Sequence, residues 1–93
     1  MTVAVCTMDL FLPNSGSLKA KRHCLSGLKA RIRNKFNVSV SEVEHNDLWQ
    51  RARLGIAVVS SDSQYAHRVL SKVVDLVESN RDVVVIDYGI ETR

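Results

Sequence analysis

The spacing of apolar residues changes repeatedly along the chain, and the order of these changes restricts the fold more than any other feature. Four segments are rich in β-branched residues or alternate apolar with polar residues, as strands do: residues 2–12, 37–43, 52–58 and 83–90. Two other segments repeat apolar residues every three or four positions, as amphipathic helices do: residues 18–36 and 66–77. The sequence therefore predicts the element order β-α-β-β-α-β.

Capping and turn-forming residues mark the limits of these elements. Residues 13–16 (Pro-Asn-Ser-Gly) are a cluster of turn formers after the first strand, and Ser17 is a natural N-cap for the first helix. Residues 60–62 (Ser-Ser-Asp) cap the second helix, which we expect to stop near Asn80.

Right-handed crossovers permit few arrangements of this order, and the commonest is the split β-α-β. It is an α+β fold in which a four-stranded antiparallel sheet, ordered 4-1-3-2, carries both helices on one face. We expect all 93 residues, 1–93, to form this single domain. The predicted core residues are Leu25, Leu28, Ile32, Leu54, Ile56, Val69, Val73 and Ile86.

The start of the chain lacks the basic residues and unbroken apolar run of a signal peptide, and no segment approaches membrane-spanning length. These features predict a cytoplasmic protein with no membrane association. Cys6 and Cys24 are not in a CxxC pair, and neither lies near a histidine with ligand spacing. We therefore expect both thiols to be reduced and mostly buried.

Charge is unevenly distributed along the chain. Residues 18–36 hold seven of the 13 lysines and arginines and no acid, which leaves six basic against ten acidic residues elsewhere. Arg22, Lys29 and Arg33 fall on one side of the apolar stripe of this helix, and Arg31 and Lys35 flank the other. A solvated charged face is the ordinary explanation. Such faces normally mix signs, however, and cations in the first turns oppose the helix dipole, so the segment also suggests a polyanionic partner.

The loop before this helix could hold an anion such as phosphate, because its backbone N–H groups and those of the helix start are free to donate. A capped loop is also simply how a helix begins, and the spacing of a P-loop is missing. The candidate RNA- or anion-binding residues are Ser15, Ser17, Lys19, Lys21, Arg22, Lys29, Arg33, Arg51 and Arg53.

A second cluster of polar and aromatic residues spans the turn between the second and third strands. It contains Trp49, the only tryptophan, which is either a core or loop anchor or a stacking platform. Arg51 and Arg53 should project from the sheet face opposite the helices, beside Phe11 and Asp9, where a cation–π contact and an ion pair would be ordinary roles.

No catalytic site can be identified. The serines, cysteines and histidines have no spacing that establishes a nucleophile beside a base, and His23, His45 and His67 share no metal-ligand spacing. We predict no enzymatic activity, no metal and no cofactor, and identify no small-molecule substrate.

The chain resembles the YlxP-like family, small bacterial proteins with a domain of unknown function. The resemblance covers nearly the whole chain and is carried by the following stretches: Leu12-Pro13, Ser15, Ser17-Leu18-Lys19, Lys21-Arg22, Arg31, Arg33, residues 36–40, Glu42-Val43, Asp47, Trp49-Gln50, Leu54-Gly55 and Val59-Ser60. It implies a ferredoxin-like fold without enzymatic activity or cofactor. It also implies genes that often neighbour those of transcription and translation factors, including ribosome-binding factor A, which suggests an RNA connection by association.

These observations together predict a non-enzymatic, RNA- or ribosome-associated accessory factor that binds phosphate backbone through the basic first helix. The alternative is a homodimeric protein-interaction module that uses the open sheet face, with Val3 and Val5 beside Ala57 and Val59, and has no nucleic-acid role. A small-molecule sensor domain is a third possibility.

Overall fold

The six predicted elements are all present, in the predicted order. The computed structural model describes residues 1–93. The elements are β1 (Thr2–Phe11), α1 (Leu18–Lys35), β2 (Ser39–Glu44), β3 (Arg51–Ser60), α2 (Ser63–Glu78) and β4 (Val84–Thr92). Ser17 caps α1 by accepting the N–H of Ala20 at 3.0 Å, and Asp62 caps α2 by accepting the N–H of Gln64 at 2.9 Å. Both predicted N-caps are confirmed.

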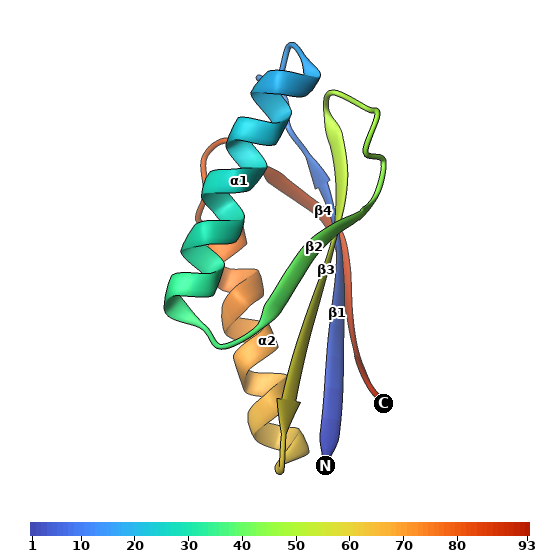
Figure 1. Ribbon diagram of the computed structural model, residues 1–93, viewed down its shortest axis with the longest axis vertical. Coiled ribbons are helices and arrows are strands. Elements are labelled where there is room, and N and C mark those ends of the chain that lie inside the picture. Colours follow the sequence, from blue (N-terminus) through green and yellow to red (C-terminus); the bar gives the residue numbers. More distant parts are fainter.

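The four strands form one antiparallel sheet in the order β2-β3-β1-β4, which is the predicted order. Both helices cover the same face of this sheet, so the other face is open (Figure 1). Val3 pairs with Val59 and Val5 with Ala57, as expected for the open face. Neither helix is long and apolar enough to cross a membrane.

The core lies between the sheet and the helices. Alternate residues of the central strands β1 and β3 form its sheet side: Ala4, Cys6, Met8, Leu10, Ala52, Leu54, Ile56 and Val58. One face of each helix forms its other side: Leu25, Leu28, Ile32, Ala66, Leu70, Val73, Val74 and Val77. Six of the eight predicted core residues are buried here. Val69 is partly buried and packs against the same cluster.

The prediction that Ile86 belongs to the core is wrong, because the side chain is half exposed. The pairing of β4 with β1 shifts by one residue at this point, so that Asp9 faces Asp87 while the next residue, Leu10, faces Val85. Ile86 is the extra residue and has no partner in β1. Such a bulge interrupts the alternation of side chains from which its burial was predicted.

A similar bulge in the edge strand β2 determines where two glutamates point. Glu42 pairs with Leu54, on the helix-covered face, whereas Glu44 pairs with Arg53, on the open face. Val43 is the extra residue, and its Cγ1 atom lies 3.0 Å from where a side chain of Gly55 would begin. Without the bulge, residues 42 and 44 would share one face. The bulge therefore places Glu42 and Glu44 on opposite faces of the sheet. The absence of a side chain at Gly55 leaves room for it.

Leu28 tests the assignment of the buried helix face, because it is 1% exposed at the centre of α1. We expect Leu28→Ala to lower the free energy of unfolding by about 2 to 5 kcal/mol, since the substitution leaves a cavity. Urea unfolding followed by circular dichroism measures the change. Ser26→Ala, at an exposed position of the same helix, should stay within about 0.5 kcal/mol of the wild type. Equal effects of the two substitutions would contradict the assignment.

Candidate nucleic-acid interface

Lys21 was predicted to bind an anion at the surface, and this prediction is wrong because the side chain is 0% exposed. Leu18, Lys21, Leu25, Leu28 and Ile32 follow one another at intervals of three and four residues along α1. Lys21 thus occupies a position of the buried stripe. The sequence contained this signal, but the positive charge of the residue led to its assignment to the outer surface.

The buried ammonium group of Lys21 has three oxygen neighbours. It donates hydrogen bonds to the carbonyl oxygens of His45, at 2.6 Å, and Leu48, at 2.7 Å. The Oε2 atom of Glu42 lies 2.7 Å away in an ion pair, and this buried oxygen has no hydrogen-bond partner of its own. A buried charge is costly unless it is compensated, and here two hydrogen bonds and one ion pair compensate it. Lys21 therefore ties α1 to both β2 and the β2–β3 loop.

The two candidate serines serve the start of α1. The Ser17 hydroxyl caps the helix, and the buried Ser15 donates its hydroxyl proton to the carbonyl oxygen of Ser17 at 3.3 Å. The predicted anion donors in this loop are backbone N–H groups rather than these hydroxyls, and their binding of an anion stays a prediction. Because Lys21 is buried, Lys19 and Arg22 are the only exposed cations left near the predicted anion site at the start of α1.

Arg53 projects onto the open sheet face as predicted, but its charge is compensated there. Its guanidinium group forms ion pairs with Asp9 at 2.7 Å and with Glu44 at 2.8 Å. The hydrogen bond from Arg53 is the main reason that the pKa of Asp9 lies below its usual value, and the same bond raises the pKa of Arg53. The expected ion pair with Asp9 is confirmed, and Arg53 is a poor candidate for binding phosphate.

Arg51 pairs with Phe11 in the sheet and is exposed. The predicted cation–π contact between these two residues is not formed. The cation–π contact of this protein lies on α2 instead, where the guanidinium of Arg68 stands 5.9 Å from the ring centre of Tyr65. Arg51 therefore keeps its charge free, close to the β2–β3 loop.

Six cations of α1 remain outside the core: Lys19, Arg22, Lys29, Arg31, Arg33 and Lys35. Lys29 is partly buried and the other five are exposed. The Nη2 atom of Arg33 donates to the carbonyl oxygen of Val40 at 2.9 Å, which holds one end of this side chain near β2. None of the four ion pairs in the protein involves any of the six. The outer surface of α1 is therefore positively charged and uncompensated.

Sequence reasoning missed one part of this surface. A hollow of about 830 Å³ opens between the C-terminal half of α1 and α2, and it is lined by Arg31, Lys35, Lys72 and Asp75 among others. Lys72 comes from the other helix, so the one-helix pattern could not reveal it. The hollow extends the positive surface of α1 onto α2.

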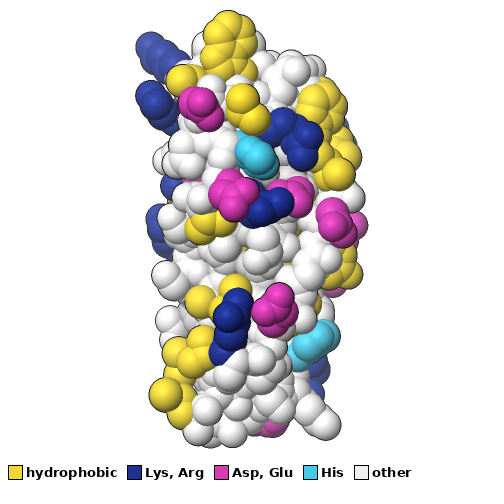
Figure 2. All heavy atoms as spheres, turned by 90° about the vertical axis from the view of Figure 1, so that its right-hand side faces the viewer, with side chains coloured by type: hydrophobic (Ala, Val, Ile, Leu, Met, Phe, Trp, Pro, Cys, Tyr) yellow, Lys and Arg dark blue, Asp and Glu magenta, His cyan; other side chains and the backbone are white.

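The open sheet face has no continuous apolar patch. Charged side chains of both signs lie across its middle, and hydrophobic side chains gather in separate groups toward its margins (Figure 2). Val3, Val5 and Ala57 are partly buried at one end of this face, while Val59 beside them is 64% exposed. The ion-paired Asp9, Arg53 and Glu44 interrupt the apolar surface.

The two cysteines are free, as expected, although only Cys6 is fully buried. Burial raises the pKa of the Cys6 thiol to about 11, and burial together with the nearby Asp82 raises that of Cys24. Both thiols therefore stay protonated at neutral pH. No group of three or more His, Cys, Asp or Glu side chains is placed to hold a metal ion.

The topology is that of a ferredoxin-like domain, and solved structures agree. The designed protein Foldit4 superposes with a TM-score of 0.56 at 10% identity, covering 100% of this chain and 97% of its own. The designed protein LFR1 1, described as having a ferredoxin fold, gives a TM-score of 0.55 at 11% identity, covering 100% and 87%. These likenesses establish the fold alone.

The particular family follows from sequence. The model of the family described as "Protein of unknown function (DUF503)" matches residues 3–90, and the chain belongs to this family. It is also 44% identical over 71 residues to "Uncharacterized protein YlxP" of Bacillus subtilis (strain 168), a match that covers 76% of this chain and 77% of that protein. The resemblance to the YlxP-like family is thereby confirmed.

The role of Lys21 can be tested by Lys21→Met, which keeps most of the stem and removes the charge. We expect a loss of about 3 to 5 kcal/mol in unfolding free energy, because Glu42 is left as an unpaired, largely buried charge. Lys21→Met combined with Glu42→Met should recover much of the loss, since both charges are then removed. The measurement is urea unfolding. Lys19→Met is the matched control at an exposed position, and a loss no larger than that of this control would show that Lys21 is not buried as described.

Proposed function

We propose that the protein is a non-enzymatic RNA- or ribosome-associated accessory factor of the cytoplasm, which binds phosphate backbone through the outer surface of α1. The observation that carries the proposal is the set of six cations on α1 that have no acidic partner. Glu42 is engaged by Lys21, and Asp9 and Glu44 by Arg53. Asp75 and Asp82 line hollows beside Arg31 but form no ion pair with any of the six cations.

The cost of this arrangement supports a ligand. α1 has no acidic residue in its first turn, where the helix dipole favours acids, and it carries Lys19 and Arg22 near that end. Like charges spaced three or four residues apart also destabilise a helix. A polyanion would relieve both effects by neutralising the cations.

The spacing of the cations suits an extended backbone. Lys19, Arg22, Lys29 and Arg33 lie along one side of the helix, and residues 19 to 33 span about 21 Å at 1.5 Å per residue. That length covers several successive phosphates of a strand. Contacts of this kind position a nucleic acid without reading its sequence, so we expect little sequence preference.

The alternative, a homodimer joined through the open sheet face, has its support in Val59 and its partly buried neighbours Val3, Val5 and Ala57. A second copy would cover this apolar end of the sheet. The charged cluster across the middle of the face counts against a large dry interface, since its charges would lose water. We therefore place this function second.

The RNA proposal is tested with a pair of arginine variants that remove equal charge from different surfaces. Arg22→Gln with Arg33→Gln, two positions on the same side of α1, should weaken binding to 30S and 50S ribosomal subunits or to a structured RNA. It should also lower the slope of log affinity against log salt by roughly 1.4 to 1.8, because each phosphate contact contributes about 0.7 to 0.9. The control, Arg68→Gln with Arg93→Gln, alters α2 and the C-terminus instead.

Fluorescence anisotropy with labelled RNA at several salt concentrations measures both affinity and slope. Equal losses in the two double variants would mean that only net charge matters, and α1 would not be the binding surface. Absence of binding to every RNA would refute the proposal. Sedimentation velocity on the same samples then distinguishes the alternative, which predicts a concentration-dependent dimer that changes little with salt.

A further inference from the structure

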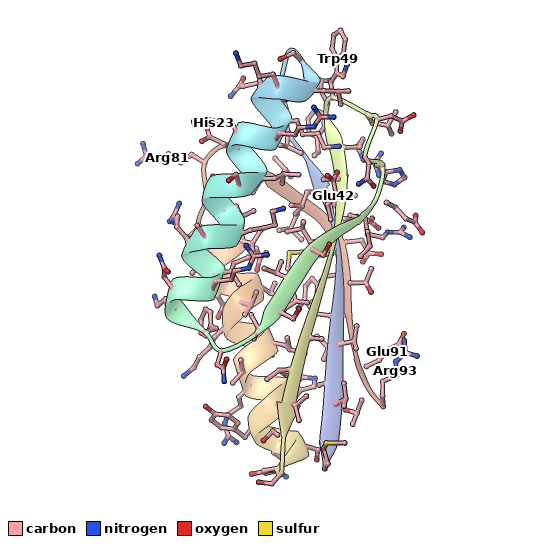
Figure 3. The ribbon with its side chains drawn as sticks, in the orientation of Figure 1. His23, Glu42, Trp49, Arg81, Glu91 and Arg93 are labelled. Atoms are coloured by element: carbon pink, nitrogen blue, oxygen red, sulfur yellow. The ribbon has the colours of Figure 1, made fainter.

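Trp49 lies in the β2–β3 loop, at the end of the molecule where α1 begins (Figure 3). Trp49 is 55% exposed, so of the expected roles a core anchor is excluded, and a loop anchor and a stacking platform remain. Leu48 beside it is 43% exposed. A large indole ring kept in contact with water at the tip of a loop contributes little to the core, and aromatic residues in such positions are common at binding surfaces.

The backbone that carries Trp49 is anchored on both sides. The carbonyl oxygen of Leu48 accepts a hydrogen bond from Lys21 at 2.7 Å, and that of Gln50 accepts one from the N–H of Leu12 at 2.8 Å. The side chain of Gln50 also donates to the carbonyl oxygen of Pro13 at 3.2 Å. The loop is therefore held in place without a ligand. A partner that binds the indole ring does not need to order this loop, so the entropy lost on binding is small.

The surroundings of Trp49 are mainly basic. Lys21 reaches the loop from the first turns of α1, and the exposed Lys19 and Arg22 belong to the same turns. Arg51 is exposed two residues after Trp49. Asp47 is the one acid of the loop, and Asp82 lines a hollow beside the start of α1, so three exposed cations stand against these two acids.

From these observations we infer that Trp49 is a stacking platform for an unpaired base of RNA, with Lys19, Arg22 and Arg51 placed to contact the flanking phosphates. The inference rests on the proposed function and adds the kind of RNA that is bound. Any base can stack on an indole ring, so stacking tolerates sequence but requires a base that is free of a helix. The preferred ligand is consequently a single strand or loop rather than a duplex.

Because Trp49 is the only tryptophan, its fluorescence reports on this site alone. A single-stranded RNA of roughly twelve nucleotides, a length within the usual range for such sites, should quench the emission in a saturable way. Inorganic polyphosphate offers the charges without bases, so it should compete for binding with little quenching. A blunt-ended duplex of the same length should bind more weakly than the single strand.

Variants separate stacking from charge. Trp49→Ala should weaken binding of the single strand by roughly tenfold or more and abolish its advantage over the duplex, while the salt slope stays unchanged. Trp49→Tyr keeps an aromatic ring and should retain much of the affinity. Leu48→Ala is the control for a neighbouring exposed apolar side chain and should bind as the wild type does.

The outcomes distinguish this inference from the function on which it rests. If RNA binds with the expected salt slope but Trp49→Ala has no effect and the emission does not change, the stacking platform is refuted and phosphate binding by α1 stands. If no probe binds, both are refuted. If Trp49→Ala abolishes only self-association or binding to a ribosomal protein, Trp49 serves a protein interface and the inference is wrong.

Discussion

The ammonium group of Lys21 lies among three oxygen atoms that belong to two different parts of the chain, the edge strand β2 and the loop that follows it. A charge in this position can be kept only if all three partners stay in place, because the cost of an unpaired buried charge is a large fraction of the stability of a small domain. The position of α1 over the sheet and the path of the β2–β3 loop are therefore coupled through one side chain. The exposed Trp49 depends on the same coupling.

The charges of the protein divide into a compensated and an uncompensated set. A one-residue bulge at Val43, whose side chain lies close to Gly55, sends Glu42 toward Lys21 and Glu44 toward Arg53. Two glutamates close in sequence thus neutralise cations on opposite faces of the sheet. The cations on the outer surface of α1 receive no such partner, and the hollow beside α2 adds Lys72 to them. This contrast within one small domain is the basis for assigning the α1 surface to a polyanion.

Much of the fold could be predicted from the sequence, because apolar periodicity, capping residues and crossover handedness all specify the same topology. The pairing of Arg53 with Asp9 also followed from strand register. Ile86 was placed wrongly, since its position depends on a bulge that periodicity alone does not reveal, and the opposite directions of Glu42 and Glu44 depend on a second such bulge. Lys21 was misplaced because its charge outweighed its position on the buried stripe of α1. The exposure of Trp49 depends on tertiary hydrogen bonds to its loop, which no local pattern contains.

The central claim, that a buried Lys21 ammonium organises α1 and the loop, can be tested by nuclear magnetic resonance of the lysine side-chain nitrogens. A buried ammonium group with two hydrogen bonds and an ion pair should exchange its protons with water far more slowly than the exposed Lys19, Lys35 and Lys72 do. Scalar couplings from its nitrogen to the carbonyl carbons of His45 and Leu48 would identify its two hydrogen-bond partners directly. Proton exchange as fast as that of Lys19, with no such couplings, would contradict the account.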